Sequence, residues 1–210
     1  MKDVEDWRTA NRIARNLLNE LESHNPSRKG HGDRVSVYAV ACAYELGARD
    51  EDLYSLKFAA MLHDIGKLSI SREILERNSA ITEEERSAIR RSVLSGGEIL
   101  AEEFEKRNFS FPLESRISRE EFIRACKEIL LHQYEGLPSD RAPLASRILH
   151  LCCAYDVMVT PQPWCKEKSE IEAIREIQNL SEKQFDPKVV EAFLKIRHLI
   201  QPIFPISWKP

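Results

Sequence analysis

The stretch Ala59-Ala60-Met61-Leu62-His63-Asp64-Ile65-Gly66-Lys67 places a histidine and an aspartate side by side at the end of an apolar run. Neighbouring residues on a helix point about 100° apart, so His63 and Asp64 can converge on one ion only where the helix ends. Imidazole nitrogen and carboxylate oxygen together suit Mn, Fe or Zn, and Lys67 offers a cation of the kind that binds phosphate groups. The stretch therefore predicts a metal site for phosphate chemistry. The alternative is an ordinary helix end with a solvated Asp64 and a surface Lys67.

Helical patterns continue on the N-terminal side of this stretch. Apolar residues at helical spacing begin at Val4, and the helix that they predict must end before Pro26. Two further helices are expected, over residues 31–46 with Gly47 as the C-cap, and over residues 50–66.

Helix-start signals recur on the C-terminal side. In three capping boxes, a glutamate follows a hydroxyl residue by three positions: Thr82 and Glu85, Ser118 and Glu121, and Ser169 and Glu172. A short helix is expected from Ser71, and Pro143 and Pro187 suit first helical positions before residues 144–157 and 189–200. Loops are expected over residues 107–117, 136–142 and 160–168. No segment alternates as a strand would, so we predict an all-α protein of about seven to nine helices. Residues 1–27 would form an N-terminal helix and linker, and residues 28–210 one helical bundle.

Composition narrows the classes of function. The 210 residues carry a net charge of -3, which gives no reason to propose nucleic acid as a partner. No run approaches the ~18 apolar residues of a membrane span, and the N-terminus lacks the apolar segment of a signal peptide. The five cysteines contain no C-x-x-C pair, which argues against a disulfide framework. These features predict a cytoplasmic protein with no membrane partner.

Several motifs accompany the central stretch. They are His31-Gly32-Asp33-Arg34-Val35, Ile81-Thr82-Glu83-Glu84-Glu85, Arg147-Ile148-Leu149, Tyr155-Asp156-Val157-Met158 and Gln184-Phe185-Asp186-Pro187. In this combination the chain resembles the HD superfamily of metal-dependent phosphohydrolases. More narrowly, it is similar to the HD-GYP branch, the cyclic di-GMP phosphodiesterases, from about Lys29 to Leu194. The resemblance implies an all-α HD-domain bundle that binds a nucleotide or cyclic dinucleotide.

The chain departs from the HD-GYP pattern at ligand positions. Ser92 stands where the branch has a histidine, and Cys153 stands where it has an aspartate. The segment Leu131-His132-Gln133-Tyr134-Glu135-Gly136-Leu137-Pro138 replaces H-H-E-x-x-D-G-x-G-Y-P. His132 could match either histidine of that motif, so a ligand and a structural histidine are equal alternatives for it.

The resemblance implies a specific set of site residues. The metal ligands would be His31, His63, Asp64, His132 and Cys153. Asp64 and Lys67 would be catalytic, and Lys67 and Arg34 would bind the substrate. Fe or Mn is expected, but a Cys153 thiolate would favour zinc, whereas a Cys153 packed in the core would bind nothing. Three or four ligands suit one ion better than two, and a site without metal is the remaining alternative.

Two hypotheses of function follow from this set. In the first, the chain hydrolyses phosphoesters, because a bound metal ion lowers the pKa of water and polarises the phosphoryl oxygen. The loss of ligands at Ser92, Leu131 and Cys153 would weaken hydrolysis of cyclic di-GMP. In the second, the chain is a catalytically inactive HD-GYP-like module that binds a ligand or a protein partner. The sequence does not indicate the oligomeric state.

Overall fold

The computed structural model describes residues 7–79, 82–106, 117–135, 142–162 and 166–200. Helices make up all the regular structure in these ranges, apart from one isolated β-bridge between Ser181 and Phe185, so the all-α prediction is confirmed. The α-helices are α1 (Trp7–His24), α2 (His31–Glu45), α3 (Asp50–Met61), α4 (Arg72–Leu75), α5 (Glu83–Glu105), α6 (Arg119–Leu131), α7 (Leu144–Val159), α8 (Glu170–Asn179) and α9 (Pro187–Ile200), and the 3₁₀ helices are η1 (Pro26–Arg28) and η2 (Ile65–Ser69).

The helix-start signals of the sequence act as predicted. Each of the three capping boxes forms both of its hydrogen bonds, at the starts of α5, α6 and α8. Ser71 precedes the short α4, Pro187 opens α9, and Pro143 is the N-cap of an α7 that runs two residues beyond the expected end. Of the expected loops, residues 107–116, 136–141 and 163–165 lie outside the described residues.

The prediction for the end of the third helix was wrong. We expected α3 to continue to Gly66, but it ends at Met61, and η2 begins at Ile65. The His63 ring explains the early end, because its Nδ1 lies 2.7 Å from the carbonyl oxygen of Ala60 and occupies an acceptor of the last helical turn. His63 and Asp64 therefore lie in a turn rather than on a helix.

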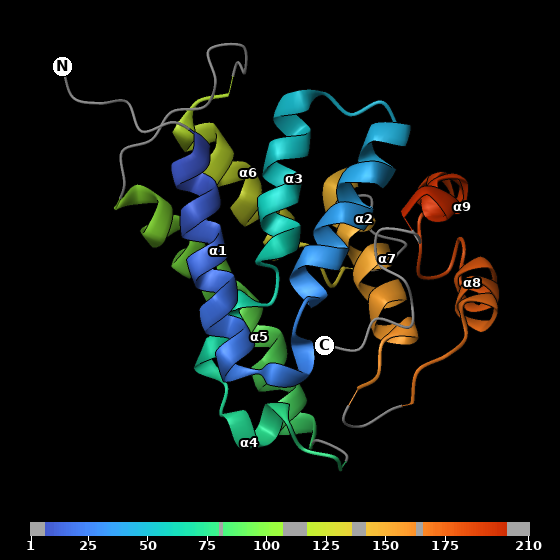
Figure 1. Cartoon of the computed structure of the whole chain (residues 1–210), viewed down its shortest axis with the longest axis horizontal. Coiled ribbons are helices and arrows are strands. Elements are labelled where there is room, and N and C mark those ends of the chain that lie inside the picture. Colours follow the sequence, from blue (N-terminus) through green and yellow to red (C-terminus); the bar gives the residue numbers. More distant parts are fainter. Residues whose placement is uncertain (1–6, 80–81, 107–116, 136–141, 163–165, 201–210) are drawn as a thin grey trace.

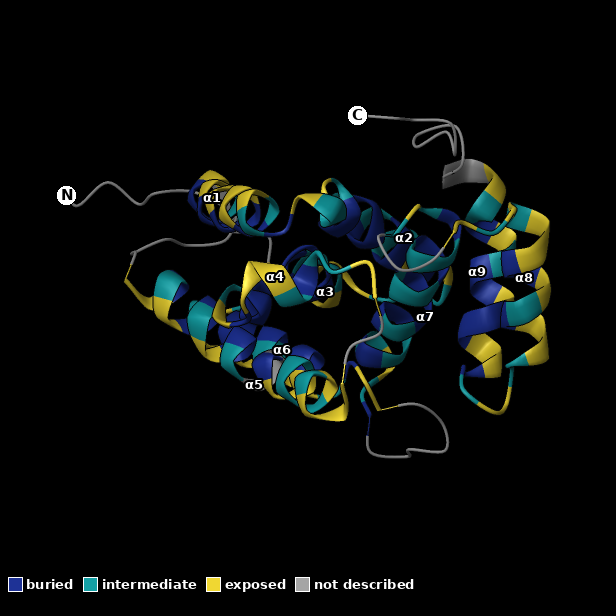
Figure 2. Cartoon of the chain, turned by 90° about the horizontal axis from the view of Figure 1, so that it is seen from below, coloured by how far each residue is buried: buried dark blue, intermediate teal, exposed yellow. Residues whose placement is uncertain are grey.

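The helices form one bundle around a continuous apolar core. Helix α2 packs against α3, α7 and α9, while α5 packs against α6 and η2. Figure 1 shows α1 along one side of this bundle and α8 and α9 at the other. Figure 2 shows the buried faces of the helices turned inward. Because Leu17, Leu18 and Leu21 of α1 belong to the same core, the N-terminal helix packs on the bundle. The boundary at residues 27 and 28 stays a prediction.

Two aromatic groups join the helices of the core. Phe58, Phe104 and Phe122 meet edge to face, with ring centroids 5.3 to 5.9 Å apart, and connect α3, α5 and α6. Tyr155 of α7 makes similar contacts with Tyr38 of α2 at 5.6 Å and Phe193 of α9 at 4.8 Å. These contacts hold α3 and α7, the helices that carry or precede the candidate site, in fixed positions.

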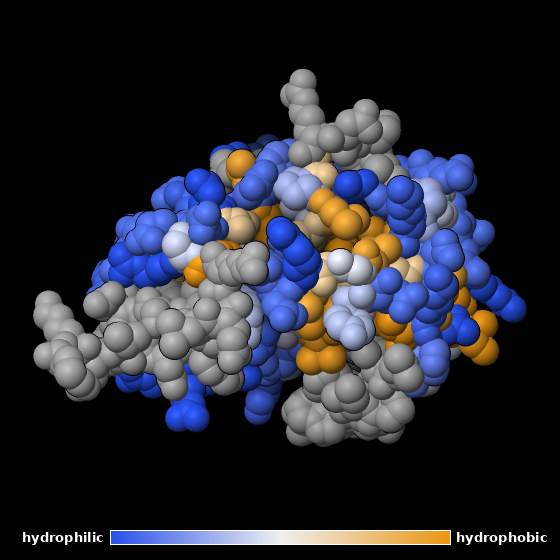
Figure 3. Space-filling model, turned by 90° about the horizontal axis from the view of Figure 1, so that it is seen from above, coloured by the Kyte–Doolittle hydropathy of each residue, from blue (hydrophilic) through white to orange (hydrophobic). Residues whose placement is uncertain are grey.

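The surface is mixed in character. Hydrophilic residues surround a hydrophobic area near the centre of the face in Figure 3. None of the helices described here combines the length and the apolar character that crossing a bilayer requires.

A close backbone contact fixes η2 against α5. A Cβ atom built on Gly66 would lie 1.7 Å from the carbonyl oxygen of Ser92, and the facing residue on α5 is a second glycine, Gly96. Any side chain at Gly66 must push the two elements apart, because the atom that it meets belongs to the backbone.

We predict that Gly66→Ala lowers the free energy of unfolding by about 3 kcal/mol or more, since overpacking a tight contact strains the backbone on both sides. Gly97→Ala is the matched control. It lies on α5, where the added Cβ meets nothing closer than 3.7 Å, and removing a glycine from a helix interior should stabilise the protein by about 0.5–1 kcal/mol. Urea unfolding followed by circular dichroism measures both. Equal stability of the two variants would show that the contact is not tight.

Candidate metal centre

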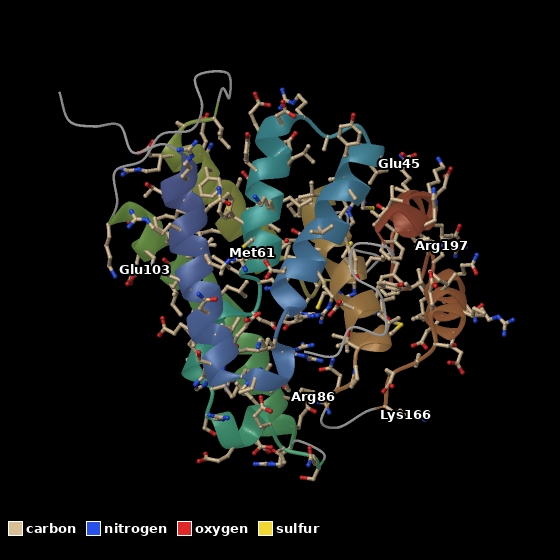
Figure 4. The ribbon with its side chains drawn as sticks, in the orientation of Figure 1. Glu45, Met61, Arg86, Glu103, Lys166 and Arg197 are labelled. Atoms are coloured by element: carbon tan, nitrogen blue, oxygen red, sulfur yellow. The ribbon has the colours of Figure 1, made fainter. Side chains whose placement is uncertain are left out.

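Three segments that are distant in the sequence meet at the end of α3. His31 is the first residue of α2, His63 lies in the turn after α3, and Cys153 lies in α7. Met61, labelled in Figure 4, marks this point in the interior of the molecule. A Cβ atom on Gly32 would lie 2.3 Å from the carbonyl oxygen of Met61. The start of α2 therefore rests directly on the end of α3, which brings the two histidines together.

The three side chains direct their ligand atoms at one point. His31 Nε2 and His63 Nε2 are 3.1 Å apart, and Cys153 Sγ lies 3.8 Å from the first and 3.5 Å from the second. Within the part of the chain that the structure describes, these residues form the one group of three whose donor atoms all lie within 4.8 Å of one another. Both histidines are 2% exposed, whereas Cys153 is partly exposed.

The other ring nitrogens fix the tautomers of both histidines. His63 Nδ1 lies 2.7 Å from the carbonyl oxygen of Ala60, which can only accept a hydrogen bond. His31 Nδ1 lies 2.7 Å from Asp156 Oδ2, which is an acceptor when ionised. Each Nδ1 therefore carries the proton, and each Nε2 presents a lone pair to the other. Two lone pairs facing each other at this distance require a positive charge between them, either a proton or a metal ion.

The spacing and chemistry of the donors fit a metal ion. Around a tetrahedral zinc ion, two nitrogen ligands lie about 3.3 Å apart and a nitrogen and a sulfur ligand about 3.6 Å apart. The corresponding distances here are 3.1 Å, 3.5 Å and 3.8 Å. Each histidine is also held by a hydrogen bond from its Nδ1, as is usual for metal-ligating imidazoles.

The electrostatics of the centre favour the ligating form of Cys153. Burial alone would raise the pKa of the thiol, but the neighbouring His63 and His31 hold its pKa well below the ordinary value. Burial likewise opposes protonation of His63, yet the charges of Asp64 and Cys153 raise its pKa above the ordinary value. The anionic surroundings of His63 Nε2 thus attract a cation, and a metal ion would compete there with a proton.

A charged cluster adjoins the three donors. Asp64 Oδ1 lies 3.6 Å from His63 Nε2, while Asp64 Oδ2 accepts a hydrogen bond from Lys67 Nζ at 2.7 Å and faces Arg28 Nη2 at 3.5 Å. Burial would raise the pKa of Asp64, but Lys67, His63 and Arg28 hold it well below the ordinary value. Asp64 is therefore a carboxylate that lies between the candidate ligands and two cations.

The structure does not bring His132 into this group. His132 Nδ1 lies 2.9 Å from Glu135 Oε1, and the side chain lines a cavity of about 980 Å³ between α5 and α6. His150 is also directed elsewhere, because its Nδ1 faces the carbonyl oxygen of Gln133 at 3.0 Å. The Ser92 hydroxyl donates a hydrogen bond to the carbonyl oxygen of Ile89 in its own helix, and Ser92 is not among the residues whose ligand atoms converge.

Arg34 is linked to His31 through Asp156. Its Nε and Nη2 donate to Asp156 at 2.6 Å and 2.9 Å, and Asp156, which is fully buried, in turn accepts from His31. The guanidinium of Arg34 is thus already paired with a carboxylate and orients His31 through it.

The sequence analysis gave no role in the site to three residues near the centre: Asp156 and Gln133, which stand in motifs that it quoted, and Arg28, which it did not single out. Asp156 follows Cys153 by three positions, a helical spacing that places both on one face of α7. Gln133 Nε2 donates to the carbonyl oxygen of His63 at 3.1 Å and supports the turn. Arg28 had no signal in the sequence beyond its charge, because its position depends on the path of η1.

Comparison with known proteins assigns this architecture to a family. A model described as "HD domain" matches residues 15–189. A cyclic di-GMP phosphodiesterase of Thermotoga maritima is 30% identical over 198 residues, which cover 90% of this chain and 49% of that protein. The cyclic di-GMP phosphodiesterase response regulator RpfG of Xanthomonas campestris is 25% identical over 214 residues, covering 97% and 52%. The chain spans about half the length of these relatives.

Solved structures share the fold. The HD domain of the phosphodiesterase PgpH of L. monocytogenes, in complex with cyclic-di-AMP, has a TM-score of 0.55 at 14% identity and is matched over 93% of this chain and 100% of that one. A cyclic GMP-AMP specific phosphodiesterase of V. cholerae has a TM-score of 0.52 at 23% identity, covering 89% of this chain and 40% of that one.

We predict that His63→Ala and Cys153→Ala each remove most of the bound metal, because each deletes one of three converging donors. His132→Ala and His150→Ala are the controls and should keep it, since His132 lies outside the group of three donors and His150 Nδ1 faces the carbonyl oxygen of Gln133. Elemental analysis measures the metal content. In cobalt-loaded protein, the near-ultraviolet thiolate-to-cobalt absorption should disappear in Cys153→Ala but persist in His132→Ala. Loss of metal in the His132 variant would place the ion elsewhere.

A second prediction concerns the support behind His31. Burial alone would raise the pKa of Asp156, but the hydrogen bonds from His31 and Arg34 lower it from 3.8 to about 2. Because the pKa is lower in the folded state, this stabilisation is present above pH 3.8 and disappears as the pH falls towards 2. Asp156→Asn should therefore lower the free energy of unfolding by about 2 kcal/mol or more at neutral pH, and by less in acid.

Asp33→Asn is the control for Asp156→Asn, because Asp33 pairs with Arg15 on the surface, where the two side chains are 32% and 50% exposed. Such a pair contributes about 0–1 kcal/mol. Denaturant unfolding at a series of pH values measures both variants. A loss in Asp156→Asn that stays constant with pH would contradict an electrostatic origin.

Proposed function

The chain belongs to the HD domain family, and on this basis we propose that it hydrolyses phosphoesters with one bound divalent ion and acts only weakly on cyclic dinucleotides. The observation that carries the proposal is the convergence of His31 Nε2, His63 Nε2 and Cys153 Sγ beside a buried Asp64–Lys67 pair. Residues that could bind a metal ion thus lie next to a lysine that could bind a phosphate group, and metal-assisted phosphate hydrolysis uses both.

We propose that His31, His63 and Cys153 hold the ion, with Asp64 as the nearest further ligand. A thiolate among the donors favours zinc over the iron or manganese that the sequence analysis expected. When bound, such an ion would act as a Lewis acid and lower the pKa of a water molecule. His132 has no part in this proposal, because it does not join the group of converging donor atoms.

The protein side chains have separate roles in this proposal. Lys67 offers an ammonium group that would stabilise negative charge developing on a phosphoryl oxygen. Asp64 holds Lys67 in place through the 2.7 Å hydrogen bond. Burial lowers the pKa of Lys67, and the carboxylate of Asp64 opposes that shift. We assign Arg34 to the positioning of His31 through Asp156 rather than to substrate binding, since its donors are occupied.

The proposed weakness towards cyclic dinucleotides follows from the donors at hand. The curated relatives are named as phosphodiesterases of cyclic di-GMP, and attack on a phosphodiester benefits from a second ion at the leaving oxygen. Here Ser92 directs its hydroxyl into its own helix and His132 faces another cavity, so neither adds a ligand. An ester with a good leaving group needs less help at that oxygen.

We predict that the zinc-loaded protein turns over bis(nitrophenyl) phosphate and hydrolyses cyclic di-GMP slowly or not at all. Asp64→Ala should lower kcat/KM for the nitrophenyl ester by about 100-fold or more, because it removes a carboxylate beside the ion and releases Lys67. Asp33→Asn, a surface carboxylate variant, should leave it unchanged.

Robust turnover of cyclic di-GMP that Asp64→Ala abolishes would show that the ligands present are sufficient. Turnover of neither ester by protein that retains its metal would instead support a non-catalytic binding module.

A further inference from the structure

Arg28 is a buried cation whose hydrogen bonds are incomplete. Its side chain is 10% exposed. The Nε atom has no hydrogen-bond partner, Nη1 reaches Gln162 Oε1 only at 3.3 Å, and Nη2 faces Asp64 Oδ2 at 3.5 Å. A guanidinium group carries five donors, and burying it with so few partners is unfavourable unless something else completes them. Such an orphaned donor needs an explanation.

Asp64 alone does not explain the position of Arg28. The carboxylate oxygen nearest to Arg28 already accepts the 2.7 Å hydrogen bond from Lys67. Arg28 and Lys67 therefore bring two positive charges to a single carboxylate, and both side chains are nine-tenths buried. This pair of cations lies beside the proposed metal centre, where a substrate would bind.

Neighbouring groups hold the guanidinium at this place. Arg28 ends η1, three residues before His31, so its backbone is fixed by the same turn that starts α2. Gln162 Nε2 donates to the carbonyl oxygen of Thr160 at 3.1 Å, which leaves Gln162 Oε1 to face Arg28. The side chain is thus supported from α7's C-terminal end while its Nε remains open.

We propose that Arg28 and Lys67 form a binding site for the terminal phosphate group of a phosphomonoester. This inference rests on the proposed function and names its substrate class. A planar guanidinium can donate two parallel hydrogen bonds to phosphate oxygens, and Lys67 adds a point charge. A monoester phosphate carries close to two negative charges at neutral pH, whereas a diester carries one, so the two cations favour the monoester.

The first experiment measures binding directly. Inorganic phosphate is titrated by calorimetry into the zinc-loaded protein and its Arg28→Gln, Arg28→Lys and Arg15→Gln variants. We expect Arg28→Gln to weaken phosphate binding by about 10-fold or more. Arg28→Lys should weaken it less, because lysine keeps the positive charge but cannot donate two parallel hydrogen bonds as the guanidinium does. Arg15→Gln removes a surface arginine and should bind as the unchanged protein does. Metal content and Tm, measured for each variant, identify any that does not fold.

The second experiment measures substrate choice. The ratio of kcat/KM for nitrophenyl phosphate to that for bis(nitrophenyl) phosphate should fall by about 10-fold in Arg28→Gln, which a merely structural role would not produce.

Equal phosphate affinity and an equal ratio in Arg28→Gln, with hydrolysis intact, would overturn the role of Arg28 and leave the proposed function standing. Phosphate binding that depends on Arg28 in a protein that hydrolyses neither ester would support the phosphate site and overturn hydrolysis. No phosphate binding by the unchanged, metal-loaded protein would overturn the site.

Discussion

The carboxylate of Asp156 is the constraint on which the centre depends. It is completely buried in α7 and accepts hydrogen bonds from His31 and Arg34, which both belong to α2. A buried carboxylate is stable only when its acceptors are filled, so α2 must present both donors to it. This requirement sets the rotation of α2, and with it the direction of His31 Nε2. The proton on His31 Nδ1, and therefore the free lone pair on Nε2, is a consequence of the same bond.

Cys153 offers a sulfur donor at the position where the resemblance to the HD-GYP branch implies an aspartate. Cys153 lies on α7 one turn before Asp156, so the helix that orients His31 also carries the third candidate ligand atom. Sulfur is softer and forms longer bonds than carboxylate oxygen, and the distances of 3.5 Å and 3.8 Å to the imidazole nitrogens accommodate it. The nearby carboxylate of Asp64 is held by Lys67 and Arg28. The centre thus combines two imidazoles with the side chains of Cys153 and Asp64, and the cations Lys67 and Arg28 face Asp64.

Sequence alone predicted the elements that local interactions determine. The capping boxes and the proline positions act over three or four residues, so they predicted the helix starts whatever the tertiary structure. The end of α3 was mispredicted because the His63 ring competes for a backbone carbonyl, which helical periodicity does not reveal. His31, His63 and Asp64 could be predicted from their motifs, although their roles remain proposals. Cys153 was ambiguous between core packing and ligation, since its partners are 122 and 90 residues away. Arg28 was missed for the same reason, because only the meeting of η1 with the turn after α3 gives it a neighbour.

Because the candidate ligands come from separate segments, binding of a metal ion to them would depend on the folded bundle. His31, His63 and Cys153 come from the start of α2, the turn after α3 and the middle of α7. An unfolded chain would bring these three residues together rarely, so an ion would bind mainly to the folded state. It would then stabilise that state by an amount that grows with the ratio of the free ion concentration to its Kd. The facing lone pairs of the two Nε2 atoms add to this dependence. Without a cation, the two Nε2 atoms would face each other at 3.1 Å in a buried position, beside the negative charges of Asp64 and Cys153 that raise the pKa of His63. The same packing that stabilises the core therefore leaves one position in it that a cation completes.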